Sequence, residues 1–396
     1  SFEKVKGTII ILPEKKEKPR IRSDLPTQTL RGSVRDRDSR SPLPFATVVV
    51  LNSDPARGTT TDSAGNFRFD ELPVGRHSLM VTYVGYEDAL FSEILLGSAK
   101  EVVLSVEIAE RSESIGEVSI SYKKGDPLNQ MTSVSSVSFS VEETKRYPVS
   151  ISDPARMAQV FAGVSGYDDA TNEIVIRGNS PNWLQWRLEG VEIPSPNHFA
   201  EEGYTSGAVS ILSSNLMSTS DFFTGAFPAE YGNALSGVFD LRLRKGNSQE
   251  REYSFQAGAL GIDFAAEGPF KKGYDGSYLI NYRYSTFALL DNFNVNLSQN
   301  ALPEYQDLSF KVNLPTKKAG SFSLWGIGGK ANDDEQYLPD TTAGENPEHG
   351  YKDFTKTGMY ALGLSHIIFP DDKSYVKTVI SQSMSYSSET FEQMNR

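Results

Sequence analysis

The chain has 396 residues, no cysteine and a formal net charge of −12 at pH 7. Without cysteine it cannot form disulfides, thiolate metal sites or a thiol nucleophile, and its acidic balance disfavours nonspecific binding to a nucleic-acid backbone. The longest apolar runs, such as Ile9–Leu12 and Val48–Leu51, are strand-sized and far shorter than the roughly 20 residues of a membrane helix.

Residues 1–27 contain one expected strand and a charged linker. Gly7–Pro13 is apolar enough for a strand, and we expect it to be the end of a further upstream domain. The basic residues that follow are interleaved with Glu and Pro, which favours a solvated linker over a segment that binds nucleic acid or lipid. The chain starts at Ser1 without a signal peptide and stops at Arg396 shortly after a strand, so we expect a processed or partial chain.

Residues 28–108 have the pattern of a small antiparallel β-sandwich. Turn signals at Asp62–Asn66 and Leu72–Gly75 separate short strand candidates. Strands of this length and spacing are typical of a sandwich. The expected strands are Leu30–Arg35, Thr47–Leu51, Asn66–Phe69, His77–Tyr83 and Glu101–Ile108.

Four short motifs in this segment resemble the carboxypeptidase-regulatory-like domain. They are Gly32–Asp36, Pro44–Ala46, Thr61–Phe67 and Val84–Tyr86. The resemblance implies a β-sandwich without peptidase activity of its own.

Residues 109–246 mix helix and strand. Asp153 and Pro154 predict a helix that runs through Met157 to Phe161 and ends at Gly163. The Glu189-Gly190 turn predicts a hairpin between its two flanking strands. The expected strands are Glu173–Arg177, Leu184–Leu188, Val191–Ile193, Ser220–Thr224 and Gly237–Arg244.

Residues 247–396 alternate between apolar and polar side chains. In Gln306–Leu314, four apolar residues lie on one face, and Asp307, Ser309, Lys311 and Asn313 lie on the other. Both a membrane barrel and a soluble β-sandwich produce this alternation, and periodicity alone favours the soluble sheet. The other expected strands are Tyr253–Gly258, Tyr278–Ser285, Tyr351–Ile368 and Ser374–Ser388.

The motifs before these strands favour the membrane alternative. Ile174–Gly178 and Ala229–Gly232, with the turn Leu188–Val191 between them, resemble the plug of a TonB-dependent outer-membrane transporter of Bacteroidetes type. The resemblance implies a mainly β chain: the small sandwich, an α+β plug over 109–246, and the first strands of an incomplete transmembrane antiparallel β-barrel over 247–396. The barrel would contact outer-membrane lipid, and the N-terminal domain would lie in the periplasm.

By the same resemblance, seven residues carry the plug motifs. Arg177 and Glu230 would lie in the barrel lumen and need partners of opposite charge. The family pattern favours Asp at the position of Glu189. The motif residues are Arg177, Gly178, Glu189, Gly190, Glu230, Tyr231 and Gly232.

The segment between sandwich and plug is the expected TonB box. An extended peptide can add as a strand to the periplasmic domain of TonB through backbone hydrogen bonds, with little demand on its side chains. The alternative interpretation is a last strand or a plain linker. The box residues are Ile115, Gly116, Glu117, Val118, Ser119, Ile120 and Ser121.

Two plug loops are the candidate ligand contacts, because the resemblance places such loops toward the extracellular ligand. The candidates are Asn182, Trp183, Asn197, His198, Phe199 and Tyr204. Siderophore, oligosaccharide, peptide and vitamin all stay open as ligands, and so does the presence of a surface lipoprotein partner.

No motif predicts catalysis. His198 and Glu201 have the His-x-x-Glu spacing of a zinc site, but His-Glu-x-x-His, the nucleophile elbow and the phosphate loop do not occur. We therefore expect no catalytic residue, no metal, no cofactor and no nucleic-acid partner. The expected function is uptake of an extracellular ligand, driven by the proton gradient through TonB. The alternative is a non-transporting surface protein for ligand binding or adhesion, in which 250–396 would pack its apolar face inside.

Overall fold

The computed structural model describes residues 2–5, 8–11, 26–36, 41–51, 53, 55–98, 100–108, 136–139, 153–166, 171–200, 205, 207, 209–258, 261–285, 304–316, 318–337, 350–371 and 374–394. The chain divides into two compact units, one formed by Ser1–Asp36 and Ser41–Glu113 and the other containing Ser114–Arg396. Among the described residues, no helix has the length and apolar character needed to cross a membrane.

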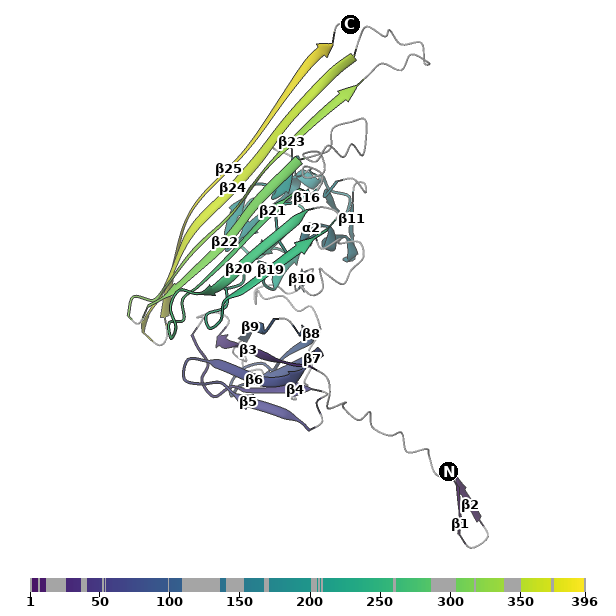
Figure 1. Ribbon diagram of the computed structural model, residues 1–396, viewed down its shortest axis with the longest axis vertical. Coiled ribbons are helices and arrows are strands. Elements are labelled where there is room, and N and C mark those ends of the chain that lie inside the picture. Colours follow the sequence, from purple (N-terminus) through teal and green to yellow (C-terminus); the bar gives the residue numbers. More distant parts are fainter. Residues whose placement is uncertain are drawn as a thin grey trace. The chain divides into compact units, whose positions relative to one another are not determined.

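The first unit contains a hairpin and a β-sandwich (Figure 1). The hairpin pairs β1 (Phe2–Val5) with β2 (Thr8–Ile11). One sheet of the sandwich has the order β6 (Asn66–Pro73), β3 (Thr27–Asp36), β9 (Val102–Ile108). The other has the order β5 (Arg57–Thr60), β4 (Thr47–Leu51), β7 (Gly75–Thr82), β8 (Ala89–Leu96). Apolar residues of both sheets, such as Leu30, Val48 and Leu79, form its core.

The expectation of a wholly antiparallel sandwich is wrong in one place, because β3 and β9 are parallel. Alternation shows which side chains share a face, but it carries no information about strand direction. The sequence also missed β5 and β8. The segment Arg57–Thr60 has no apolar side chain to reveal a strand, and Ala89–Leu96 does not alternate regularly.

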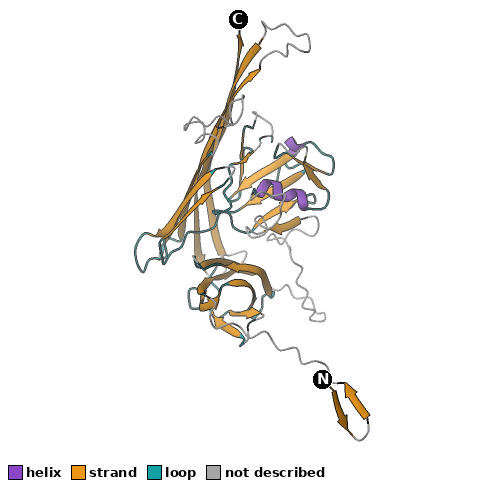
Figure 2. Cartoon of the chain, turned by 45° about the vertical axis from the view of Figure 1, so that its right-hand side comes forward, coloured by secondary structure: helices purple, strands orange, loops and turns teal. Residues whose placement is uncertain are grey.

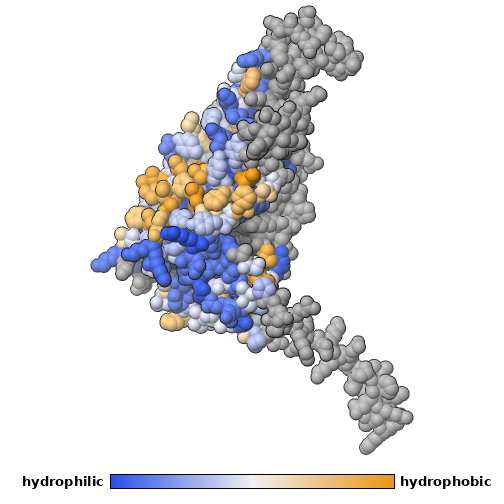
Figure 3. Space-filling view, in the orientation of Figure 1, coloured by the Kyte–Doolittle hydropathy of each residue, from blue (hydrophilic) through white to orange (hydrophobic). Residues whose placement is uncertain are grey.

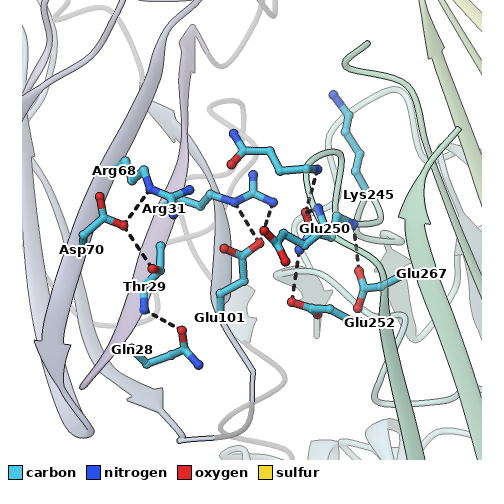
Figure 4. A network of polar contacts seen from close by, with 12 residues as sticks. Gln28, Thr29, Arg31, Arg68, Asp70, Glu101, Lys245, Glu250, Glu252 and Glu267 are labelled. Atoms are coloured by element: carbon cyan, nitrogen blue, oxygen red, sulfur yellow. Dashed lines mark hydrogen bonds and ion pairs between the residues drawn. The ribbon is translucent and has the colours of Figure 1, made fainter. Parts of the chain in front are cut away.

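Polar side chains join the strands of the β6-β3-β9 sheet (Figure 4). Arg31 donates from Nε and Nη2 to Oε1 of Glu101 at 3.0 and 2.8 Å, next to the start of β9. Thr29 and Arg68 both donate to Oδ1 of Asp70, at 3.1 and 2.7 Å.

The central unit, as we call the described residues of 136–247, is an α+β structure (Figure 2). Its five-stranded sheet has the order β10 (Ser136–Phe139), β17 (Ser220–Phe223), β18 (Gly237–Leu241), β13 (Leu184–Leu188), β14 (Val191–Ile193). Two small sheets pair β11 (Val164–Gly166) with β12 (Ile174–Ile176) and β15 (Asn197–His198) with β16 (Val209–Ser210). Its helical elements are α2 (Pro154–Met157) and the 3₁₀ turns η2 (Ala158–Val160) and η3 (Pro181–Trp183).

The predicted helix through Phe161 is shorter than expected. The α-helix ends at Met157, a 3₁₀ turn follows, and Phe161 is already extended, with ψ of 147°. Asp153 lies just before α2, and its carboxylate accepts hydrogen bonds from Asn172 Nδ2 at 2.8 Å and from the Ser210 amide at 3.1 Å. Tertiary contacts thus hold the beginning of this helix.

The large sheet, as we call β19–β25, is a seven-stranded antiparallel meander. The sequence missed two of its strands, β20 and β23, because glycines and acidic residues interrupt their apolar pattern. Its strands are β19 (Glu252–Ala257), β20 (Ile262–Pro269), β21 (Ser277–Tyr284), β22 (Glu304–Pro315), β23 (Ser321–Tyr337), β24 (Gly350–Asp371) and β25 (Ser374–Met394).

The two faces of the large sheet differ in polarity. On β22 the polar set Asp307, Ser309, Lys311 and Asn313 is buried, whereas Leu308 is 41% exposed. The apolar side chains continue outward in rows across neighbouring strands, and Figure 3 shows hydrophobic residues gathered in one zone of this sheet. The large sheet therefore turns its polar face toward the central unit and its apolar face outward.

The central unit and the inner face of the large sheet share one core. Trp186 stacks on Phe239 at 4.6 Å between ring centroids. The same cluster includes Leu279 and Trp325 of the large sheet. Leu279, which interrupts the polar face of β21 in the sequence, thus packs in the core shared with the central unit.

Candidate functional site

The Glu189-Gly190 turn is the first point where the central unit is tied to the large sheet. Both residues have positive φ, 55° and 91°, as a type I′ hairpin requires. Leu188 pairs with Val191 across the turn, so the predicted hairpin is confirmed. The Glu189 amide donates to Leu241 O at 2.9 Å, which holds the turn against β18.

A buried lysine of the large sheet binds this turn. Lys311 Nζ lies 2.8 Å from Glu189 Oε1 and donates to Leu243 O at 2.7 Å. The Leu243 amide donates to the same glutamate oxygen at 2.7 Å. The Glu189 side chain thus carries its carboxylate to the lysine.

We expect this pair to make stability depend on pH. Burial would raise the pKa of Glu189, but the Lys311 ammonium and the Leu243 amide outweigh it, so the pKa lies below its ordinary value of 4.5. A carboxyl whose pKa is lower in the folded state stabilises the protein above its unfolded pKa, and this contribution is lost as the pH falls through the folded pKa. Urea unfolding should therefore show wild type more stable than Glu189→Gln at pH 7.

The difference between wild type and Glu189→Gln should shrink below about pH 4.5 and vanish once Glu189 is protonated in both states. Glu250→Gln, which changes an exposed carboxylate, is the matched control. A wild-type advantage that stays constant down to pH 3 would contradict the role of the charge.

A second polar cluster lies at the start of β22. His198 Nε2 is 2.9 Å from Asp307 Oδ2. Arg283 donates to the same oxygen from Nε at 2.9 Å and from Nη2 at 2.7 Å, and its Nη2 also donates to Ser210 O. The Tyr305 ring lies 4.7 Å from the His198 ring and 5.3 Å from the Arg283 guanidinium.

The pKa of His198 lies below its ordinary value of 6.5. Burial lowers the pKa of His198, and Asp307, which favours the protonated ring, does not offset the effect. A ring that donates from Nε2 fits the Asp307 carboxylate as acceptor. The side chain is only 1% exposed, and Gly329 lies directly against it, since a Cβ at that glycine would come 2.5 Å from His198 Cε1.

Hydrogen bonds extend from this cluster to α2. Ser210 connects Arg283 to the Asp153 carboxylate, which accepts from its amide. Asn172 in turn donates to Asp153 and accepts from Arg156 Nε at 2.6 Å. A continuous polar path thus runs from the large sheet to the first helix of the central unit.

A third ion pair between the central unit and the large sheet is formed by a residue that follows β18. Arg244 forms a two-pronged ion pair with Glu267 of β20, at 2.6 and 2.8 Å. Glu267 also accepts from the Asn247 amide at 2.9 Å. Charged residues that are buried against a sheet are retained where geometry and hydrogen bonds are good, as here.

Some of the motif residues predicted from the sequence are exposed in the structure, and others are buried. Arg177 and Gly178 form an exposed turn with φ of 51° and 77°. Glu230 is exposed, whereas Tyr231 is buried and donates to Asp240 Oδ2 at 3.1 Å. Gly232 O accepts from Gln185 Nε2 at 2.8 Å. Glu189, His198 and Arg244 each form an ion pair with the large sheet.

The predicted ligand-binding residues also include both exposed and buried side chains. Asn182 and Trp183 are exposed, the latter by 49%, and Phe199 is half-buried. Asn197 and His198 are buried. Tyr204 and the expected box Ile115–Ser121 lie outside the described residues.

A cavity of about 280 Å³ brings some of these loops together. Asn182 and Asn197 line it, and Asn182 Oδ1 accepts from the Thr205 amide at 3.1 Å. The opposite wall includes Thr357, Met359 and Ser385 of β24 and β25.

Sequence reasoning missed the partners on the large sheet. Asp307, Lys311 and Arg283 were placed on the polar faces of their strands without a predicted role, and no role was predicted for Arg244 or Glu267. Charged residues at inward positions of alternating strands were the available signal. In the described part of the chain, no group of three or more His, Asp or Glu could hold a metal ion.

One protein-family model matches part of the chain. Residues 29–109 match the carboxypeptidase regulatory-like domain, which confirms the predicted resemblance for that part of the chain. A search of curated proteins found no match.

Several solved structures resemble the chain at low identity. The outer membrane transporter YddB from Escherichia coli has 11% identity and a TM-score of 0.39, with coverage of 63% of this chain and 38% of that chain. The siderophore receptor PirA from Pseudomonas aeruginosa has 13% identity and a TM-score of 0.34, with coverage of 66% and 49%. A putative carbohydrate binding protein from Bacteroides uniformis has 10% identity and a TM-score of 0.19, with coverage of 21% and 41%. The chain thus spans half or less of each of these proteins.

Proposed function

We propose that the protein takes up an extracellular ligand across the outer membrane in a TonB-dependent manner. The central unit would be the plug, the large sheet would be part of a transmembrane β-barrel, and the carboxypeptidase regulatory-like domain would lie in the periplasm.

The observation that carries the proposal is the polarity of the large sheet. A soluble sandwich buries its apolar face, but here the buried face holds Asp307, Lys311 and Asn281, and the exposed face holds Leu308, Ile280 and Leu364. Apolar residues outside and polar residues inside are the pattern of a barrel in lipid. The central unit covers the polar face, as a plug in a lumen would.

The two ends of the large sheet support a direction. The connections 285–303 and 338–349 are long, whereas 316–320 and 372–373 are short, as at the extracellular and periplasmic ends of outer-membrane barrels. His198 forms its ion pair with Asp307 near the long connections, at the start of β22. Arg244 forms its ion pair with Glu267 near the short connections, at the end of β20. The loops with Asn182 and Trp183 would accordingly face the ligand.

Both edges of the large sheet support closure by further strands. β19 and β25 each pair on one side only within the described sheet. An unpaired edge exposes backbone N–H and C=O groups, which is costly in hydrocarbon. A closed barrel would satisfy them.

Transport would begin when the ligand favours the state in which residues 115–121 are exposed to the periplasm. TonB would add to this segment as a strand and pull, and the proton gradient would thereby rearrange the plug. The network from Arg283 through Ser210 to Asp153 offers a physical connection between the large sheet and α2.

Capture of the full chain by the periplasmic domain of TonB tests the proposal. Val118→Pro removes one backbone donor and should abolish capture. Val118→Thr keeps the N–H group and the β-branched shape, so it should bind like wild type.

Loss of capture in both variants would point to a side-chain contact and against strand addition. Failure of the wild-type protein to bind would favour the alternative, a surface protein that binds ligands without transport.

A further inference from the structure

The outer face of one sandwich sheet is uncharged and partly apolar. In β4, Val48 and Val50 are buried in the sandwich core, at 0% and 2% exposure. The residues between and beside them alternate to the opposite side of the sheet, where they are partly or fully exposed. Over the length where β4 pairs with β7, these outward residues are all uncharged: Thr47, Val49, Leu51, Ser78, Met80 and Thr82.

An apolar row crosses this outer face. Val49 pairs with Met80, and Met80 pairs with Leu90 of β8. Phe45, just before β4, and Val84, just after β7, add apolar side chains that are 73% and 93% exposed. Because β4 and β7 are antiparallel, these two residues lie at the same end of the sheet. Exposed apolar residues gathered on one face indicate a surface that another segment or molecule covers.

The sequence of β4 has the pattern of a strand that is covered on both faces. A continuous apolar run such as Val48–Leu51 is typical of strands buried from two sides, because successive residues alternate between the faces. The sandwich core covers only one of these faces. In β6 of the other sheet, by contrast, Arg68 and Asp70 alternate with the core residues Phe67 and Phe69. The uncharged face of the β5-β4-β7-β8 sheet therefore differs from an ordinary solvent-facing surface.

The N-terminal hairpin of β1 and β2 needs a surface of this kind. A hairpin of two strands is marginally stable at best when it stands alone in water. Its second strand has the sequence Thr-Ile-Ile-Ile, so residues 9–11 give both faces of the hairpin apolar positions. Phe2 pairs with Ile11 and Lys4 with Ile9, which places three apolar residues on one face. The runs Ile9–Leu12 and Val48–Leu51 thus share the same unmet requirement for a covering layer.

Size and tether length favour a segment of the same chain over a separate partner. Four strands about 4.8 Å apart and five residues of about 3.3 Å each give the face an area of about 250 Å². Each partner of a stable complex contributes roughly 800 Å², so a separate molecule would gain little affinity here. The connection 12–26 can extend to roughly 50 Å, and a tether holds its segment at an effective concentration of about a millimolar.

We infer that the N-terminal hairpin docks on the outer face of the β5-β4-β7-β8 sheet, with the face that carries Phe2, Ile9 and Ile11. Sheets that stack face to face lie about 10 Å apart, and their apolar side chains interdigitate across that space. The sandwich would thereby hold the N-terminal end of the chain. This contact does not depend on the proposed transport.

Disulfide trapping in the full chain tests this contact, because the chain has no cysteine of its own. Lys4→Cys leaves the apolar residues of the docking face in place. It is combined with Thr47→Cys or with Ser78→Cys, which lie on either side of the apolar row. At least one of these pairs should form an intramolecular disulfide under mild oxidation, read from non-reducing gels and from mass spectrometry of the linked peptides.

Lys4→Cys with Ser105→Cys is the matched control. Ser105 is exposed on β9 of the other sheet, and the same tether connects it to the hairpin. A hairpin that docks on the uncharged face should cross-link to Ser105→Cys at least about tenfold more slowly than to that face, whereas a freely moving hairpin would cross-link to both at similar rates.

Met80→Lys gives a second test, since it puts a charge at the centre of the face. Docking would desolvate the ammonium group, so the cross-link between positions 4 and 47 or 78 should form at least about tenfold more slowly. Met80 is only partly buried, so the urea midpoint of the sandwich should change little. Equal rates for the face and the Ser105→Cys control, or an unchanged rate in a folded Met80→Lys protein, would overturn the inference. A disulfide between two chains would also overturn it, because the face would then belong to a second copy.

Discussion

Replacing Asp307 by alanine is expected to destabilise the protein by about 3–5 kcal/mol, the cost of breaking a buried ion pair by removing one partner. Asp307 is 2% exposed and accepts from both His198 and Arg283. Without it, the Arg283 guanidinium would keep Ser210 O but lose its carboxylate. Urea unfolding in detergent micelles, followed by tryptophan fluorescence, measures the effect as a change in midpoint at constant slope.

Two variants sharpen this test. Asp307→Asn keeps an acceptor for His198 and removes the charge that Arg283 needs, so its loss should be intermediate. Asp275→Ala removes an exposed carboxylate from a turn and should change the midpoint little. If Asp307→Ala unfolded at the wild-type midpoint, the cluster would contribute no net stability.

Gly329→Ala is expected to cost about 1–3 kcal/mol, the usual range for overpacking a tight interior. A Cβ at this position would lie 2.5 Å from His198 Cε1 and 3.1 Å from Ile211 Cδ1. The glycine therefore lets the central unit lie close against β23. We expect the variant to push the His198 loop away from the large sheet, which limited proteolysis of the folded protein would detect as faster cleavage after Phe199.

Gly58→Ala is the control for the loss of a glycine. It also lies in a strand, but a Cβ there meets nothing closer than 3.6 Å. Its stability should equal or exceed that of wild type, because alanine restricts the unfolded chain. A Gly329→Ala protein with wild-type stability and wild-type proteolysis would mean that the His198 ring shifts at no cost.

Both predictions concern one inward row of the large sheet. Arg283 pairs with Asp307, Asp307 with Gly329, Gly329 with Met359, and Met359 with Ser385 across successive strands. The row begins with the ion cluster, continues through a glycine that gives the His198 ring its space, and ends at the cavity that Met359 and Ser385 line. The cavity and the His198 loop are therefore physically adjacent.

Local patterns in the sequence were enough for much of this architecture. Side chains alternate strictly along a strand, so the two faces of β22 and the exception at Leu279 could be assigned without knowing any neighbour. The Glu189-Gly190 hairpin followed from turn chemistry, and the sandwich from short strands and its motifs. These features depend on residues close together in the chain.

The remaining features of the structure depend on packing between segments that are far apart in the sequence. Lys311 and Glu189 are 122 residues apart, and His198 and Asp307 are 109 apart, so no spacing rule could pair them. Alternation could not say which face of the large sheet is inward, since a lipid-facing barrel and a soluble sandwich share the same period. The parallel pairing of β3 with β9 and the cavity at Thr205 likewise arise only when segments meet in space. Burial, which depends on what covers a residue, is a property of the folded chain.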